Sequence, residues 1–253
     1  MPTLLLIRHG RTAANASGTL AGWTPGIGLD DHGAAQAADL GTRLADVPIV
    51  AVVASPLQRA QETAAPIAAG AGVEITVEEA LGECRYGAWT GRPLAELAKE
   101  DLWRVVQRAP SAAAFPPSPE YAAESLAEMS ARAVGAVRAI DRRVREEHGD
   151  FAVWVAVSHG DVIKAIVADA LGAHLDEFQR IVVNPASVSV IHYPQGRPMV
   201  LATNGPGIGL AGTLPAPPPP KDAPADPSAG PDAGPAADDG VIGGGAGGVR
   251  VGT

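Results

Sequence analysis

Two histidines of this 253-residue chain lie in the same local setting. His9 and His159 each follow an apolar run and each precede a glycine, in the segments LLLIRHG and VAVSHG. A short apolar run of this kind predicts a buried strand, and cationic side chains at the end of such a strand need a partner. Because Arg8 stands beside His9, we expect an anionic ligand at this end of the strand.

Two further charged residues could contribute to the same site. Arg59 lies in SPLQRAQETA, in the first turn of a predicted helix, and Glu83 lies in the turn LGECRYGAWTG. Taken singly, each has an ordinary explanation, because most arginines and glutamates are solvated surface charges. The histidines could likewise be structural groups. Together with Arg8, the four residues favour a catalytic site.

These residue types suit the transfer of a phosphoryl group. A phosphate monoester is mostly dianionic at neutral pH, so catalysis depends largely on positioning and electrostatic stabilisation. Arg8 and Arg59 can each hold phosphoryl oxygens with paired N–H donors. Their charges also lower the pKa of His9, which leaves its imidazole neutral and nucleophilic. Attack on phosphorus would give a covalent phosphohistidine, with His159 donating to the phosphoryl oxygens.

Apolar runs and helical patterns alternate along the first 204 residues. Strands are predicted at 3–7, 49–53, 74–77, 151–157, 187–193 and 199–202. Helices are predicted at 31–45, 56–69, 94–107, 121–147 and 161–171, and the segment 94–107 is predicted to contain two short amphipathic helices. This order predicts an α/β fold, an open and mostly parallel sheet with helices on both faces. Ligands bind such sheets beyond the carboxyl ends of the strands, where Arg8, His9 and His159 are predicted to lie.

Four segments carry a resemblance to a known family. RHGRTAAN, SPLQRAQETA, GECRYGAWTG and VSHGD, in this order, resemble the histidine phosphatase superfamily, the group with phosphoglycerate mutase-like proteins, from about residue 3 to about residue 204. The resemblance implies a mixed α/β sheet, a phosphohistidine on His9, and Glu83 as general acid and base. Asn15 matches a position that commonly contributes a further amide donor. Arg11 stands where many members have Glu or Gln, which would add a positive charge near the mouth of the site.

Three functions are compatible with these residues. The first is a metal-independent phosphomonoester hydrolase acting on a small phosphorylated metabolite. The second is a phosphomutase, which needs the same pocket but keeps water out. The third is a non-catalytic module that binds a phosphorylated ligand or a protein, and the joint presence of the four site residues counts against it.

The segment 93–124 is predicted to form a lid over the site. The glycolytic mutases of the family carry a longer and more basic insertion there, whereas this segment has few basic residues beyond Lys99, Arg104 and Arg108. A hydrolase is therefore favoured over a glycolytic mutase. Trp23 lies in a loop that resembles the family's substrate-side loop, and is predicted to pack either over the substrate or over the sheet.

Neither a metal nor a nucleotide cofactor is expected. Two arginines at one place would repel a cation, and the sequence has neither a Gly-rich dinucleotide fingerprint nor a P-loop lysine motif. The formal net charge of −9 argues against a surface for nucleic acid or anionic membranes. The single cysteine and the lack of a signal peptide or long apolar run favour a cytoplasmic protein.

The composition changes sharply after Asn204. Residues 205–253 are rich in Gly, Pro, Ala and Asp and have almost no apolar periodicity. We therefore predict a catalytic domain over residues 1–204 and a disordered tail over residues 205–253, with no partner named by its sequence. A homodimer is compatible with the sequence.

Overall fold

A computed structural model describes residues 2–194, 197–210 and 214 of the chain. Its centre is a six-stranded sheet with the strand order β3-β2-β4-β1-β5-β6. The strands are β1 (Thr3–Arg8), β2 (Ile49–Ala54), β3 (Ile75–Val77), β4 (Val153–Ser158), β5 (Val188–His192) and β6 (Met199–Gly205). The four strands β3, β2, β4 and β1 are parallel, and β5 and β6 add to the sheet as antiparallel strands.

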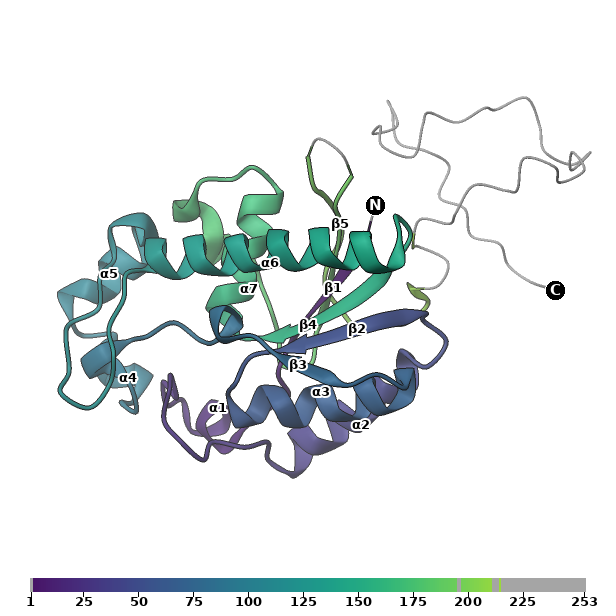
Figure 1. Ribbon diagram of the computed structural model, residues 1–253. Coiled ribbons are helices and arrows are strands. Elements are labelled where there is room, and N and C mark those ends of the chain that lie inside the picture. The colour runs from purple at the N-terminus through teal and green to yellow at the C-terminus, as the bar shows by residue number, and fades with distance from the viewer. Residues whose placement is uncertain (1, 195–196, 211–213, 215–253) are drawn as a thin grey trace, which may run out of the picture.

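Helices cover both faces of the sheet, as predicted (Figure 1). One face carries α2 (Asp31–Arg43) and α3 (Gln58–Ala71), and the other carries α6 (Leu126–His148) and α7 (Gly160–Ala170). The shorter helices are α1 (Ala13–Ser17), α4 (Leu94–Leu97) and α5 (Asp101–Arg108), with 3-10 turns at Glu79–Leu81, Gly87–Trp89, Pro110–Ala112 and Leu175–Arg180. No helix of the described ranges is both long and apolar enough to cross a membrane.

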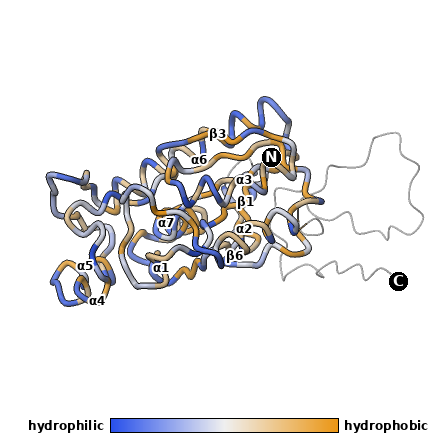
Figure 2. The backbone as a smooth tube through the Cα atoms, turned by 90° about the horizontal axis from the view of Figure 1, so that it is seen from below, coloured by the Kyte–Doolittle hydropathy of each residue, from blue (hydrophilic) through white to orange (hydrophobic). Residues whose placement is uncertain are grey.

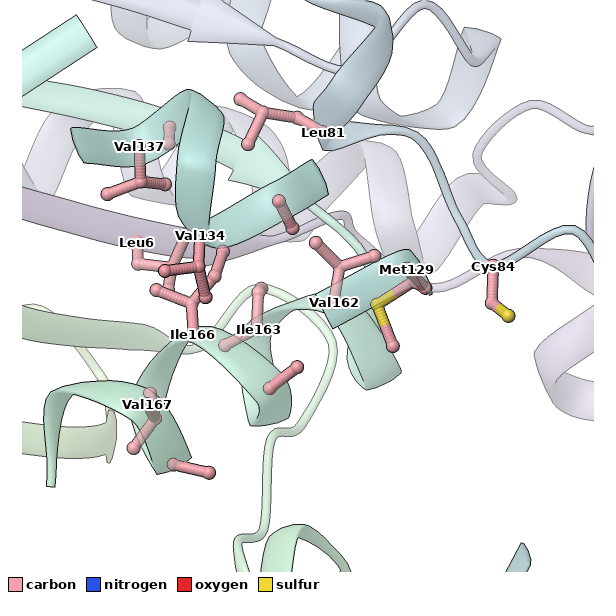
Figure 3. Close-up of a cluster of buried hydrophobic side chains, with 14 of the residues drawn as sticks. Leu6, Leu81, Cys84, Met129, Val134, Val137, Val162, Ile163, Ile166 and Val167 are labelled. Carbon is pink, nitrogen blue, oxygen red and sulfur yellow. The ribbon is translucent and has the colours of Figure 1, made fainter. Parts of the chain in front are cut away.

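The central strand β1 is buried on both faces, which explains its unbroken apolar sequence. Leu4 and Leu6 belong to the core cluster beneath α6 and α7, whereas Leu5 and Ile7 belong to the cluster beneath α2 and α3. Successive side chains of a strand point to opposite faces, so one short run supplies both cores. Figure 3 shows the first cluster, in which Val134 of α6 and Ile166 of α7 meet Leu6.

One predicted helix begins at a different position than its hydrophobic pattern indicated. The helix predicted at 121–147 begins at Leu126, because Ser125 caps it: the Ser125 hydroxyl accepts from the backbone N–H of Glu128, and the Glu128 carboxylate accepts from that of Ser125. The segment 94–107, for which the sequence predicts two short amphipathic helices, contains α4 and α5. The two form the extension at one end of the molecule in Figure 2 and carry both hydrophobic and hydrophilic stretches.

Most of the predicted tail lies outside the described residues. Of residues 205–253, only 205–210 and 214 are described. The division of the chain after Asn204 therefore stays a prediction.

A buried carboxyl on α6 gives a first testable expectation. Asp141 is 7% exposed, accepts a hydrogen bond of 3.0 Å from the indole of Trp154, and burial raises its pKa to about 6. A raised carboxyl pKa means that the folded protein binds more protons than the unfolded chain between about pH 4 and pH 6. The free energy of unfolding therefore falls as pH rises through this window.

Asp141→Asn keeps an acceptor for the indole but removes the titration. We expect the stability of this variant relative to the parent protein to rise between about pH 4 and pH 6 and then to level off. Denaturant unfolding across this range measures the difference, with Asp46→Asn at an exposed position as the control. A difference that does not change with pH would contradict the assignment.

Candidate active site

His9 directly follows β1 and is 3% exposed. Its backbone N–H donates to the carbonyl of Ser158 on the neighbouring strand (3.0 Å), and its Nδ1 lies 2.7 Å from the carbonyl oxygen of Gly10. Because a carbonyl can only accept, Nδ1 carries the proton and Nε2 keeps a free lone pair. Burial, Arg59 and Arg8 lower the pKa of His9 well below its ordinary value, so the imidazole is neutral.

The glycine of the RHG segment is explained by a close backbone contact. A Cβ at Gly10 would lie 2.7 Å from the carbonyl oxygen of Gly33 in the first turn of α2. The backbone N–H of Gly10 donates to the hydroxyl of Thr63 on α3 (2.9 Å). The loop after His9 is therefore held against two helices, and any larger residue at position 10 would move it.

His159 lies at the matching position directly after β4 and is fully buried. Its ring centroid is 5.1 Å from that of His9, and burial together with Arg59 and His9 lowers its pKa well below the ordinary value. Its Nε2 is 2.7 Å from the hydroxyl of Ser55 at the end of β2, while its Nδ1 is buried without a hydrogen-bond partner. Ser55 was not singled out in the sequence, although it opens the segment that contains Arg59.

Arg8 and Arg59 are each anchored through one nitrogen to a backbone carbonyl. Arg8 Nη1 donates to Val183 (2.7 Å), and Arg59 Nη2 donates to Gly22 (2.9 Å). Arg8 Nε is buried and makes no hydrogen bond. Burial lowers the pKa of both guanidinium groups, while Glu83 acts in the opposite direction. Both groups are thus oriented by protein contacts and retain N–H donors for an anion.

Glu83 lies in the turn that follows β3, as a neighbour of both arginines. The backbone N–H of Cys84 donates to its carboxylate (2.9 Å). Burial and the nearby Asp161 raise the pKa of Glu83 to about 7, although Arg59 and Arg8 favour its charged form. A carboxyl with this pKa can both give and take a proton near neutral pH.

The backbone of Glu83 is fixed by the side chains of Trp23 and of Arg132, the second of which the sequence did not indicate. Trp23 Nε1 donates to the Glu83 carbonyl (2.6 Å), and Arg132 on α6 donates to the same carbonyl (3.0 Å) and to Gly82 (2.9 Å). Arg132 is itself paired with Glu124 (2.6 Å). Trp23 is not among the residues that line the cavity described next, so its observed role is to hold the Glu83 turn.

These elements enclose a cavity of about 440 Å³. Of the predicted site residues, Arg8, His9, Asn15, Arg59 and Glu83 line it. His159 lies behind His9 and is not itself a lining residue, although Gly160, next to it in the chain, is. The structure therefore brings all the predicted site residues to one place, with His159 as the inner member of the histidine pair.

Asn15 presents its amide group from α1. Its Oδ1 accepts hydrogen bonds from the backbone N–H and the hydroxyl of Thr12, which together cap this short helix. The side-chain carbonyl is thus engaged with the protein, and the amide nitrogen is the donor left for a ligand.

The other predicted charges lie away from the cavity lining. Arg11 pairs with Asp30 (2.8 Å), and it does not supply the positive charge expected at the mouth. Lys99, Arg104 and Arg108 of the predicted lid are also absent from the lining, whereas Lys164 of α7 is present. No group of three or more His, Cys, Asp or Glu residues within the described ranges is arranged to hold a metal ion.

Comparison with known proteins identifies the class of protein. Residues 4–205 match the model of the histidine phosphatase superfamily (branch 1), so the chain belongs to this family. Phosphoserine phosphatase 1 of Hydrogenobacter thermophilus is 30% identical over 208 residues, which cover 81% of this chain and 92% of that protein. An uncharacterized protein of Mycobacterium tuberculosis is 53% identical over 78 residues, which cover 31% of this chain and 38% of that protein.

The fold agrees with the family. The crystal structure of phosphoserine phosphatase from Entamoeba histolytica in complex with 3-phosphoglyceric acid has a TM-score of 0.69 to this chain at 25% identity. The match covers 81% of this chain and 98% of that one. The predicted family and the predicted mixed, mostly parallel sheet are both confirmed.

Proposed function

We propose that the protein is a phosphomonoester hydrolase that works through a phosphohistidine on Nε2 of His9. This proposal rests on a neutral, buried imidazole that lines the same cavity as two arginines and a carboxyl with a pKa of about 7. The substrate class is a small phosphorylated metabolite.

The proposed reaction has two steps. Nε2 of His9 attacks phosphorus, the bond from phosphorus to the ester oxygen breaks, and Glu83 gives its proton to the departing alkoxide. Water then attacks the phosphorus of the phosphohistidine and Glu83 takes a proton from that water. The bond from phosphorus to Nε2 breaks, which releases inorganic phosphate and restores the neutral imidazole of His9. Arg8, Arg59 and the Asn15 amide bind the phosphoryl oxygens, and His159, whose buried Nδ1 has no hydrogen-bond partner, supplies a further donor.

The decisive experiment traps the intermediate and identifies the product. Rapid quenching of the enzyme with a radiolabelled phosphate ester is expected to give an acid-labile, alkali-stable label on His9, followed by release of inorganic phosphate. An isomerised phosphoester with no free phosphate would indicate the phosphomutase instead. Binding of phosphate esters without label or turnover would indicate the non-catalytic module.

Metal independence is a separate expectation. The positive charge in this site comes from guanidinium groups, which can stabilise a phosphoryl group without a divalent ion. We expect kcat/KM in excess EDTA to stay within about twofold of its value in untreated buffer, whereas catalysis through a bound metal would be lost. A large loss that is restored by a divalent cation would contradict this mechanism.

A further inference from the structure

One wall of the cavity is built from aromatic side chains. Tyr86, Trp89, Trp103 and Phe115 all line it, and they are four of the ten Phe, Trp and Tyr residues of the chain. The ring of Phe115 is 4.9 Å from that of Tyr86 and 5.4 Å from that of Trp89, and Trp103 stacks on Trp89 at 6.3 Å. We call these four residues the aromatic wall.

The polar atoms of the aromatic wall are largely occupied by the protein. The hydroxyl of Tyr86 donates to Asp161 (2.8 Å), and the indole N–H of Trp89 donates to Glu100 (2.8 Å). Because these polar atoms are already bonded, a ligand would contact the ring carbons of the two residues. Phe115 is entirely apolar, so most of the wall is a carbon surface.

Apolar residues continue the wall to the mouth of the cavity. Leu94 of α4 is 36% exposed and Val182 is 61% exposed, and both line the cavity. The remaining apolar lining residues outside the wall are Leu20, Ala21, Val106, Ile181 and Val183. Exposed apolar side chains at the rim of a cavity mark a surface that gains free energy when a ligand covers it.

The cavity offers little for a second acidic group. Among the described lining residues, Lys164 is the one cation besides Arg8 and Arg59. Its Nζ lies 3.0 Å from the amide oxygen of Gln179 and 3.4 Å from the carboxylate of Asp161, so its charge is already compensated. A ligand carboxylate in the outer cavity would face this compensated pair rather than a free cation.

The size of the cavity also exceeds that of the reacting group. A phosphoryl group fills roughly 100 Å³, about three water volumes, which leaves most of the 440 Å³ for the alcohol part of the ester. The alcohol part lies next to the aromatic wall if the phosphoryl group lies against Arg8 and His9. The volume of the cavity, its carbon surface and the compensated charge of Lys164 all favour a large, apolar alcohol.

Resting on the proposed hydrolase function, we infer that this site takes phosphomonoesters whose alcohol carries an aromatic ring, which packs against the aromatic wall beside Trp103. Trp103 is the specificity-determining residue in this arrangement. It is partly exposed on α5, an element that carries none of the proposed phosphoryl-binding residues, and it can stack with a ring that enters the cavity.

Matched esters test the inference. 2-Phenylethyl phosphate and ethyl phosphate have leaving alkoxides of similar basicity, so the ratio of their kcat/KM values reports the ring alone. We expect a ratio of about tenfold or more in favour of the phenyl compound, from stacking and burial of the ring. Phosphoserine, which adds a carboxylate and an amine instead of a ring, is expected to be a poorer substrate than 2-phenylethyl phosphate.

Variants of Trp103 show whether the wall causes the preference. In Trp103→Ala, the ratio of kcat/KM for 2-phenylethyl phosphate to that for ethyl phosphate is expected to fall to about threefold or less. Trp103→Phe keeps a ring and is expected to retain most of the preference for the phenyl compound. Phe151→Ala, at an exposed apolar position outside the cavity, is the control and should leave the ratio unchanged.

Two outcomes would overturn the inference and leave the hydrolase standing. These are equal kcat/KM values for the two esters in the parent protein, and a clear preference for phosphoserine. Turnover of none of the three esters, with no label on His9, would instead contradict the proposed function itself.

Discussion

His9→Ala is expected to lower kcat by about 10³-fold or more on every phosphate ester, because the proposed covalent intermediate forms on its imidazole. His9 lines the cavity and its Nδ1 is engaged with the carbonyl of Gly10, so Nε2 is the nitrogen proposed to attack phosphorus. Steady-state hydrolysis with inorganic phosphate detection measures the loss. The trapped label described above should disappear in the same variant.

The fold of the His9→Ala variant is expected to remain intact. The backbone N–H of His9 bonds to Ser158 and its carbonyl accepts from Ala186, and neither bond needs the side chain. Thermal unfolding checks this expectation. His32→Ala, at an exposed position of α2, is the matched control and should keep its activity. Near-normal turnover by a well-folded His9→Ala variant would contradict the mechanism.

Glu83→Gln is expected to have the second-largest effect, and the effect should depend on the leaving group. General acid catalysis contributes about 10²- to 10⁴-fold, and it matters most when the leaving group is a basic alkoxide. The loss in kcat should therefore be large for ethyl phosphate and small for p-nitrophenyl phosphate, whose leaving group departs as a stable anion. Equal losses on both substrates would argue against Glu83 as the proton donor.

The pH profile gives an independent check of the same residue. Because the pKa of Glu83 is raised to about 7, its acid form is present below this pH and is lost as pH rises through it. For alkyl esters, kcat/KM should therefore fall on the alkaline side of about pH 7, and this fall should be absent in Glu83→Gln. Glu146→Gln, at an exposed position of α6, is the control and should keep the parent profile.

The position of the histidine pair could be predicted from the sequence because strand ends are easy to recognise. Two apolar runs end in His-Gly, and parallel strands place their carboxyl ends at one edge of the sheet. The start of α6 was harder to predict, because the hydrophobic pattern continues upstream of Ser125 although this residue caps the helix. Glu83 lies in a turn with no periodicity, and its importance came from the family resemblance rather than from its spacing.

The supporting contacts could not be predicted. Ser55 and Arg132 act through hydrogen bonds to His159 and to the Glu83 turn, and these bonds join segments far apart in the sequence. Such polar contacts leave no repeating signal along the chain. The aromatic wall was hidden for the same reason, since Trp103 and Phe115 belong to separate segments that meet only in the folded protein.

The register between β1 and β4 has a consequence for how mutation can alter the substrate preference of this kind of enzyme. Arg8 pairs with Ser158 at the end of the parallel ladder, so His9 and His159 directly follow the last paired residues of two neighbouring strands, and their ring centroids lie 5.1 Å apart. The sheet therefore sets the relative position of the two histidines. Leu94 and Trp103, which line the outer cavity, belong instead to α4 and α5. Mutation can accordingly reshape substrate preference in one part of the chain while the chemical step is conserved in another.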